Sequence, residues 1–92
     1  MRFEELQELE QRVANRDERA FEELERAYTR LVQHFIFTKT ESQGRARALT
    51  ERVFEHAWKA IENYRWQDFS FHVWILRIAR DELDKQAGSP RM

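Results

Sequence analysis

Hydrophobic side chains recur along this chain at steps of three and four residues, the spacing that places them on one face of an α-helix. Four such stretches predict helices near residues 3–14, 17–37, 44–63 and 70–86. No stretch shows the strict alternation of a β-strand. Residues that interrupt helices are almost absent, and the complete set is Gly44, Gly88 and Pro90. The pattern therefore predicts an all-α fold, a compact bundle of three to four helices.

The apolar stripes also predict which side chains form the core of this bundle. Twelve positions are expected to be buried: Phe21, Leu24, Leu31, Leu49, Val53, Phe54, Ala57, Trp58, Ile61, Trp74, Ile75 and Ile78. Asn15 or Asp17 can cap the second helix, because a side-chain oxygen there satisfies free backbone N–H groups.

Two linkers separate the three long helices. The first covers residues 38–44, and the second covers residues 63–70 and carries three aromatic residues, Tyr64, Trp66 and Phe69. The domain organisation expected is an N-terminal helix over residues 1–15 packed on the bundle, a helical domain over residues 16–87 and a tail over residues 88–92.

Composition narrows the class of protein. The chain has 92 residues, of which 41% are hydrophobic and 36% charged, as in a single soluble domain. It has no cysteine, no apolar run near the ~20 residues that span a bilayer, and no signal-peptide pattern at its start. We expect a cytoplasmic protein without a membrane partner.

Charge is unevenly distributed, although the net charge is only −1. Residues 1–26 carry nine acids against five arginines, whereas residues 27–66 carry seven bases against four acids. The four bases of residues 77–91 are matched by four acids at residues 68–84. Any contact with nucleic acid is therefore expected to be local and weak.

Catalytic and metal-binding patterns are missing from the sequence. His34, His56 and His72 fall on three different predicted helices, and a metal site needs several converging ligands. No glycine-rich phosphate loop and no serine with a nearby histidine and aspartate is present. We predict that the protein is not an enzyme and holds no cofactor or metal.

Three segments, taken in order, resemble one protein family. They are the approach and start of the second helix (residues 16–31), the third helix (residues 46–61), and Tyr64-Arg65 with the string over residues 71–81. Together they look like domain two of bacterial RNA polymerase sigma factors of the extracytoplasmic-function type. The resemblance covers roughly residues 16–85 and implies the fold of that domain.

The resemblance also implies a function in transcription initiation. In that family the third helix docks on a coiled coil of core RNA polymerase. The third and fourth helices and the loop between them melt the promoter minus-ten element and capture its non-template strand. The DNA-binding residues implied here are Arg65, Trp66, His72, Arg77, Arg80 and Lys85. The polymerase- or partner-binding residues implied are Arg47, Ala48, Leu49, Glu51, Arg52 and Glu55.

Departures from the family pattern modify this expectation. Arg47 and Ala48 stand where the family carries an acidic pair, and Glu51 replaces a glutamine. Asp81 stands where asparagine is common, and a carboxylate repels a phosphate backbone. Both changes predict weaker binding, to core polymerase and to promoter DNA respectively. The family's domain for the minus-thirty-five element does not follow within these 92 residues.

Two hypotheses follow from the sequence. The chain is a working or partial sigma domain, either excised or acting with another subunit. Alternatively, it is a sigma-like interaction module that kept the fold and binds another regulator or a second copy of itself, with little binding to DNA or core polymerase.

Overall fold

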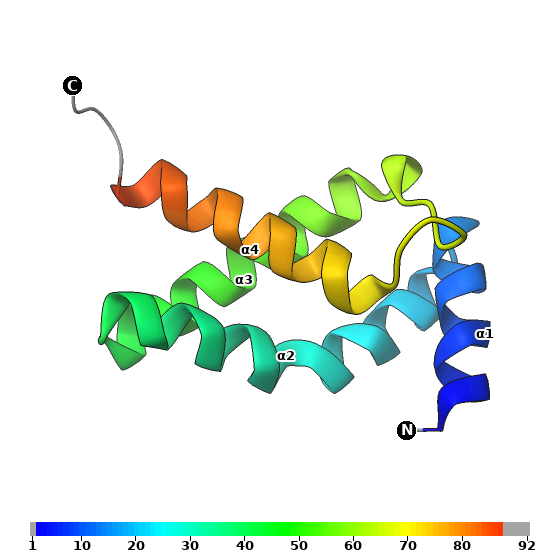
Figure 1. Cartoon of the computed structure of the whole chain (residues 1–92), viewed down its shortest axis with the longest axis horizontal. Helices are drawn as coiled ribbons and strands as arrows, with labels where there is room; N and C mark the ends of the chain where they lie inside the picture. The colour runs from blue at the N-terminus through cyan, green and yellow to red at the C-terminus, as the bar shows by residue number, and fades with distance from the viewer. Residues whose placement is uncertain (1, 88–92) are drawn as a thin grey trace.

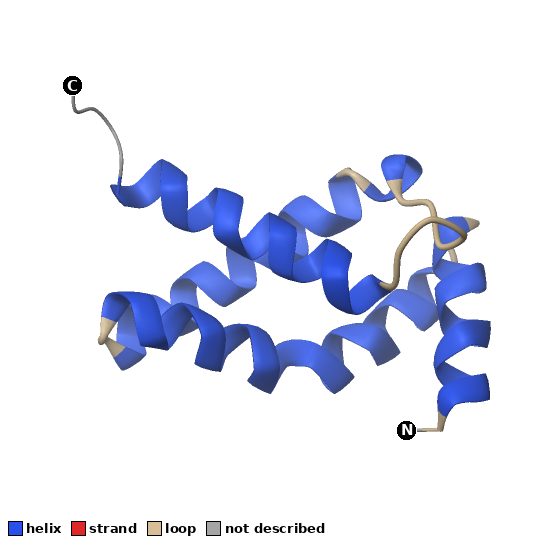
Figure 2. Cartoon of the chain, viewed as in Figure 1, coloured by secondary structure: helices blue, strands red, loops and turns tan. Residues whose placement is uncertain are grey.

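The computed structural model describes residues 2–87, which form four α-helices and one short 3-10 helix (Figure 1). The elements in chain order are α1 (Phe3–Ala14), α2 (Glu18–Thr40), α3 (Gln43–Lys59), η1 (Ile61–Asn63) and α4 (Phe71–Ala87). No β-strand occurs within these residues, so the all-α prediction is confirmed (Figure 2). The tail expected over residues 88–92 lies outside the described part of the chain.

The helices α2 and α3 run antiparallel as a hairpin, and α4 crosses and contacts both of them (Figure 1). The short helix α1 stands at one end of this hairpin, where it contacts α2 and η1. It therefore lies beside the chain segment that leads from α3 into α4.

Side-chain caps explain where two of the helices begin. The Asp17 carboxylate accepts a hydrogen bond from the Ala20 N–H at 3.1 Å, and Ser42 Oγ accepts one from the Arg45 N–H at 3.2 Å. Arg12 also donates to Asp17 at 2.9 Å, which ties the end of α1 to the start of α2. The hydrogen bond from Arg12, together with that from the Ala20 N–H, holds the pKa of Asp17 below its ordinary value.

The connection between α2 and α3 is shorter than the sequence pattern indicated. Helix α2 continues to Thr40 and ends where Glu41 adopts a left-handed conformation with φ of 55°. The Glu41 N–H then bonds the Phe37 carbonyl, which satisfies one of the free carbonyls at the helix end. Gly44, expected where the linker meets the third helix, lies in the first turn of α3. At its other end α3 stops at Lys59 and the chain continues into η1.

Nine of the twelve predicted core positions are confirmed as buried: Phe21, Leu24, Leu49, Val53, Phe54, Ala57, Ile61, Trp74 and Ile75. Trp58 and Ile78 are only half-buried. The prediction was wrong for Leu31, which is 36% exposed, because Val32 and Ile36 occupy the inward row of α2 instead. Beyond Tyr28, either of two neighbouring rows of side chains on the 23-residue helix α2 could face the core, and packing against α3 and α4 selects the row of Val32 and Ile36.

Truncation of Trp74 tests this core. Its ring lies 4.9 Å from the Tyr64 ring and 5.8 Å from the Phe71 ring, and the residue is 6% exposed. We expect Trp74→Ala to lower the free energy of unfolding by about 3–5 kcal/mol in chemical denaturation. Leu31→Ala is the control on the exposed side of α2. Equal losses for the two variants would contradict the assigned core.

Candidate functional site

The start of α4 is fixed by an aromatic cluster centred on Phe71. This residue is fully buried, and its ring lies within 6.1 Å of four other aromatic rings, those of Phe21, Tyr28, Tyr64 and Trp74. These rings come from α2, from the α3–α4 connection and from α4 itself. The cluster therefore holds the end of the loop of residues 64–70 (the α3–α4 loop) against the bundle.

A buried carboxylate from α1 completes this arrangement. Glu10 is 5% exposed, and its Oε2 accepts a hydrogen bond from the Phe71 N–H at 2.9 Å. It thus satisfies a free N–H group at the N-terminus of α4, where a negative charge is also favoured. Burial, with the Glu10 charge adding to it, raises the pKa of both Tyr28 and Tyr64.

Sequence reasoning missed Glu10, although the sequence carries a signal for it. Glu10 lies four residues after Leu6 and three before Val13, so it belongs to the apolar face of α1. A charged residue on such a face is seldom buried unless it has a partner. Here the partner is a backbone group 61 residues away in the sequence.

Tyr64 belongs to the core and not to an exposed loop. The sequence placed it with Trp66 and Phe69 in the second linker, but Tyr64 is 3% exposed. Its hydroxyl has no hydrogen-bond partner among the described residues. Trp66 and Phe69 are half-buried, and Arg65 is exposed.

Trp66 and Phe69 border a cavity of about 360 Å³ between α1 and the α3–α4 loop. Aromatic, amide and acidic side chains line it: Phe3, Leu6, Gln7, Glu10, Trp66, Gln67, Asp68, Phe69 and Ser70. Phe3 is 70% exposed, which is unusual for so large an apolar side chain. The cavity combines aromatic walls with amide side chains, which can stack on and hydrogen-bond a planar polar ring.

The six residues implied in DNA binding do not share one surface. Arg65 and Trp66 lie in the α3–α4 loop, and Arg77 extends over the Phe69 ring with 5.4 Å between the guanidinium carbon and the ring centroid. His72 is exposed and lies edge-on to the Tyr28 ring at 5.7 Å.

The other two residues lie farther along α4. Arg80 borders a different groove with Lys39 and Arg45, and Lys85 Nζ lies 3.4 Å from the Glu82 carboxylate. The structure therefore gathers Arg65, Trp66 and Arg77 about the α3–α4 loop and places Arg80 and Lys85 elsewhere.

The residues implied in polymerase binding lie on α3, and five of the six are exposed. These five are Arg47, Ala48, Glu51, Arg52 and Glu55. Leu49 is 5% exposed and belongs to the core, so it is not available to a partner. It faces inward because α3 buries the row that continues through Val53 and Ala57.

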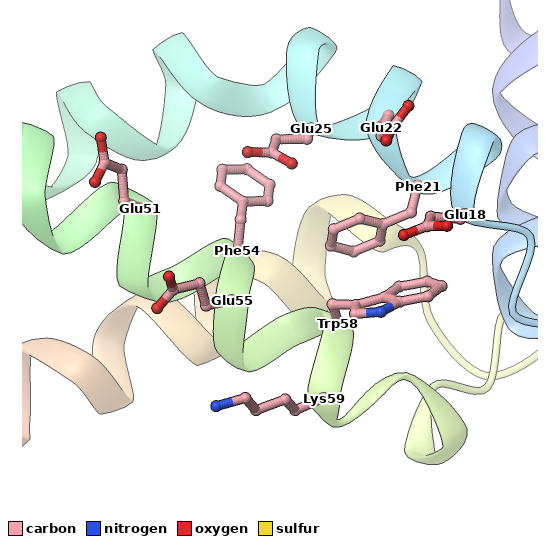
Figure 3. A pocket seen from close by; sticks show the side chains of 9 residues that line it. All are labelled: Glu18, Phe21, Glu22, Glu25, Glu51, Phe54, Glu55, Trp58 and Lys59. Carbon is pink, nitrogen blue, oxygen red and sulfur yellow. The ribbon is translucent and has the colours of Figure 1, made fainter.

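A groove between α2 and α3 has an aromatic floor and an acidic border (Figure 3). Its volume is about 560 Å³, and its floor consists of Phe21, Phe54 and Trp58. Five carboxylates and a single ammonium group surround these rings: Glu18, Glu22, Glu25, Glu51, Glu55 and Lys59. We call this the acidic groove.

The carboxylates of the acidic groove influence one another. Burial, together with the charge of the neighbouring Glu22, raises the pKa of Glu25. The groove is not apparent from the sequence of the third helix, because the acids contributed by α2 are distant along the chain from Glu51 and Glu55. A cationic partner would lower the repulsion between these carboxylates.

The buried carboxylate of Glu82 on α4 contacts a side chain of α3. Glu82 is 2% exposed, and its carboxylate contacts His56 Nδ1 and Lys85 Nζ. Within residues 2–87, no three His, Asp or Glu side chains are grouped so that they could hold a metal ion. His56 links α3 to α4 through its contact with Glu82.

The sequence from within α2 to within α4 matches a known family. The sequence model of the Sigma-70 region 2 family matches residues 24–85, which include the α3–α4 loop. This chain belongs to the Sigma-70 region 2 family. No curated protein and no solved structure matches it.

Members of this family act in core polymerase binding and promoter melting. No described helix of this sigma region 2 chain is long and apolar enough to cross a membrane. Helix α1, with Glu10, lies outside the matched residues.

Substitution of Glu10 tests the link between α1 and α4. Glu10→Ala leaves the buried Phe71 N–H without an acceptor, so we expect the free energy of unfolding to fall by about 1–3 kcal/mol. Glu10→Gln keeps an acceptor oxygen and should lose less. Glu8→Ala, on an exposed position of α1, is the control. If the Glu10→Ala and Glu8→Ala variants had the same free energy of unfolding, the role of this hydrogen bond would be contradicted.

Proposed function

We propose that this chain is the region 2 module of a sigma factor of the extracytoplasmic-function type. In this role it binds core RNA polymerase and captures the promoter minus-ten element as a single strand. It is a binding module without catalytic chemistry of its own. The observation that carries the proposal is the aromatic cavity beside the α3–α4 loop, in a chain of the sigma region 2 family.

The cavity supports strand capture because an unstacked base needs a surface that replaces its lost stacking. Trp66 and Phe69 supply aromatic faces, and Gln67 supplies an amide that can hydrogen-bond a base edge. Arg65 and Arg77 lie at the same end of the molecule and can contact phosphates. The hydrogen bond from Phe71 to Glu10 fixes the point at which the loop enters α4.

Strand capture predicts a defined response to mutation and salt. A labelled minus-ten-like single strand should bind the purified chain weakly, and its affinity should fall steeply with salt as phosphate contacts release counterions. The double change Arg65→Ala with Trp66→Ala should weaken binding about tenfold or more, since stacking contributes about 1–3 kcal/mol per base. Fluorescence titration measures both effects.

The matched control for this experiment lies on α2. Arg30→Ala with Phe37→Ala also removes one arginine and one half-buried aromatic ring, on a surface away from the loop. We expect this control to bind the strand as the unmodified chain does. Unchanged binding by the Arg65 and Trp66 variant would remove the loop from the binding surface.

The acidic groove supports polymerase binding through α3. Its aromatic floor can bury apolar side chains, and its carboxylates complement a basic helix. Glu51 and Glu55 come from α3, whereas Glu18, Glu22 and Glu25 come from α2. Arg47 and Ala48, the positions without the family's acidic pair, lie earlier on α3 and are exposed. We infer that the groove retains part of a docking surface that the start of α3 has lost.

Restoring the acidic pair should strengthen the complex with core polymerase. We expect Arg47→Glu with Ala48→Asp to increase affinity, most clearly at low salt where charges are least screened. Ala27→Asp with Arg30→Glu changes the net charge equally on exposed positions of α2 outside the groove, and should have a smaller effect. A pull-down with core polymerase at two salt concentrations provides the comparison. If the unmodified chain binds core polymerase tightly and the change on α3 weakens that binding, the assigned docking face is wrong.

The alternative function is an interaction module with little affinity for DNA or core polymerase. The loss of the acidic pair at Arg47 and Ala48 favours it, as do the exposed carboxylates of Asp81 and Asp84 on α4. Its partner would be another regulator or a second copy of the chain. Absence of both strand binding and core binding at low salt would favour this alternative.

A further inference from the structure

A second groove opens where the C-terminal parts of α2 and α4 meet the first turn of α3. Its volume is about 620 Å³. The residues that form its floor and border include Phe35, Lys39, Arg45, Arg80, Leu83 and Asp84. We call it the basic groove, because three of these side chains are cations and one is an anion.

The three cations of the basic groove form no ion pair within the described residues. Four ion pairs occur within residues 2–87, and none of them includes Lys39, Arg45 or Arg80. All three side chains are exposed, and Lys39 Nζ lies 5.8 Å from the centroid of the Phe35 ring. In a chain with a net charge of −1, this makes the groove a local positive site.

The start of α3 adds to this positive potential. The first turn of α3 contains no acidic residue and carries Arg45 at its third position. The N-terminus of a helix carries a partial positive charge, so a cation there is unfavourable for the helix itself. An anionic group bound in the groove would offset both charges.

The floor of the groove restricts the kind of anion that fits. Phe35 and Leu83 are half-buried and present apolar surface between the cations. A nucleic-acid backbone gains little from such a surface, because it binds proteins mainly through contacts between its phosphates and cations, and Asp84 disfavours phosphate and carboxylate alike. An amphipathic helix with acidic flanks can bury its apolar side chains on the floor and pair its carboxylates with the cations.

We propose that the basic groove binds an acidic amphipathic helix of a protein partner. The groove lies at the end of α4 away from the α3–α4 loop, so a partner held there leaves the candidate DNA surface free (Figure 1). Its charge is opposite to that of the acidic groove, so the same partner helix is excluded from the groove proposed for the polymerase. The inference goes beyond the proposed function and needs neither DNA nor polymerase.

Fluorescence anisotropy with a synthetic peptide tests the proposal on the whole chain. The probe carries leucine at helical positions i, i+3, i+4 and i+7 and glutamate on both flanks. We expect saturable binding, and the double change Arg45→Glu with Arg80→Glu should weaken it about tenfold or more. Arg19→Glu with Arg26→Glu is the matched control, because it changes the net charge equally at exposed positions on α2 outside the groove.

Three comparisons decide the outcome. Two results together support the proposal. Binding is lost when the leucines of the peptide become alanine, and it is weakened by the Arg45 and Arg80 variant but not by the Arg19 and Arg26 control. Equal weakening by both arginine pairs would show attraction by net charge only and would overturn it. Binding of a DNA duplex that depends on Arg45 and Arg80, with no peptide binding, would assign the groove to nucleic acid and would also overturn it.

Discussion

The hydrogen bond from the Phe71 N–H to Glu10 is the interaction on which the arrangement of this molecule depends. It joins α1 to α4 across 61 residues of sequence, at a point where four aromatic rings surround Phe71. A buried carboxylate is costly unless it is paired, so the bond constrains α1, the α3–α4 loop and the start of α4 together. Glu10 and Trp66 both line the neighbouring cavity, so this hydrogen bond lies beside the candidate binding surface.

A second principle of organisation is the opposite charge of two grooves that share α2. The acidic groove uses the first half of α2 with α3, and the basic groove uses its last residues with α3 and α4. Both have aromatic or aliphatic floors, so charge is the main difference between the helices that each would accept. Residues 2–87 thus carry two oppositely charged grooves and a separate cavity beside the α3–α4 loop.

Much of the fold could be predicted from the sequence, because helical periodicity is strong and Gly44 is the only glycine or proline within residues 2–87. The bounds of α1 were correct, and those of the longer helices differed by a few residues. Leu31 was misplaced because periodicity alone cannot decide between two adjacent rows on a long helix. The first linker was predicted too long, because α2 continues to Thr40 and Glu41 adopts the left-handed conformation that ends it.

The candidate site was harder to predict, because its features depend on contacts between distant segments. Tyr64 was read as a loop residue, but packing against Phe71 and Trp74 buries it. The acidic groove escaped notice because α2 and α3 each supply only part of its carboxylates. Glu10 escaped notice because its partner is a backbone N–H, which no side-chain pattern reveals.

The central claim is that this sigma region 2 chain connects core polymerase to the single-stranded minus-ten element. Anisotropy of a labelled non-template minus-ten strand, measured with core polymerase alone, with the chain alone and with both, tests this claim most directly. We predict that the mixture of chain and core binds the strand more tightly than either component does. If, at low salt, the mixture binds the strand no more tightly than core polymerase alone does, the account is contradicted.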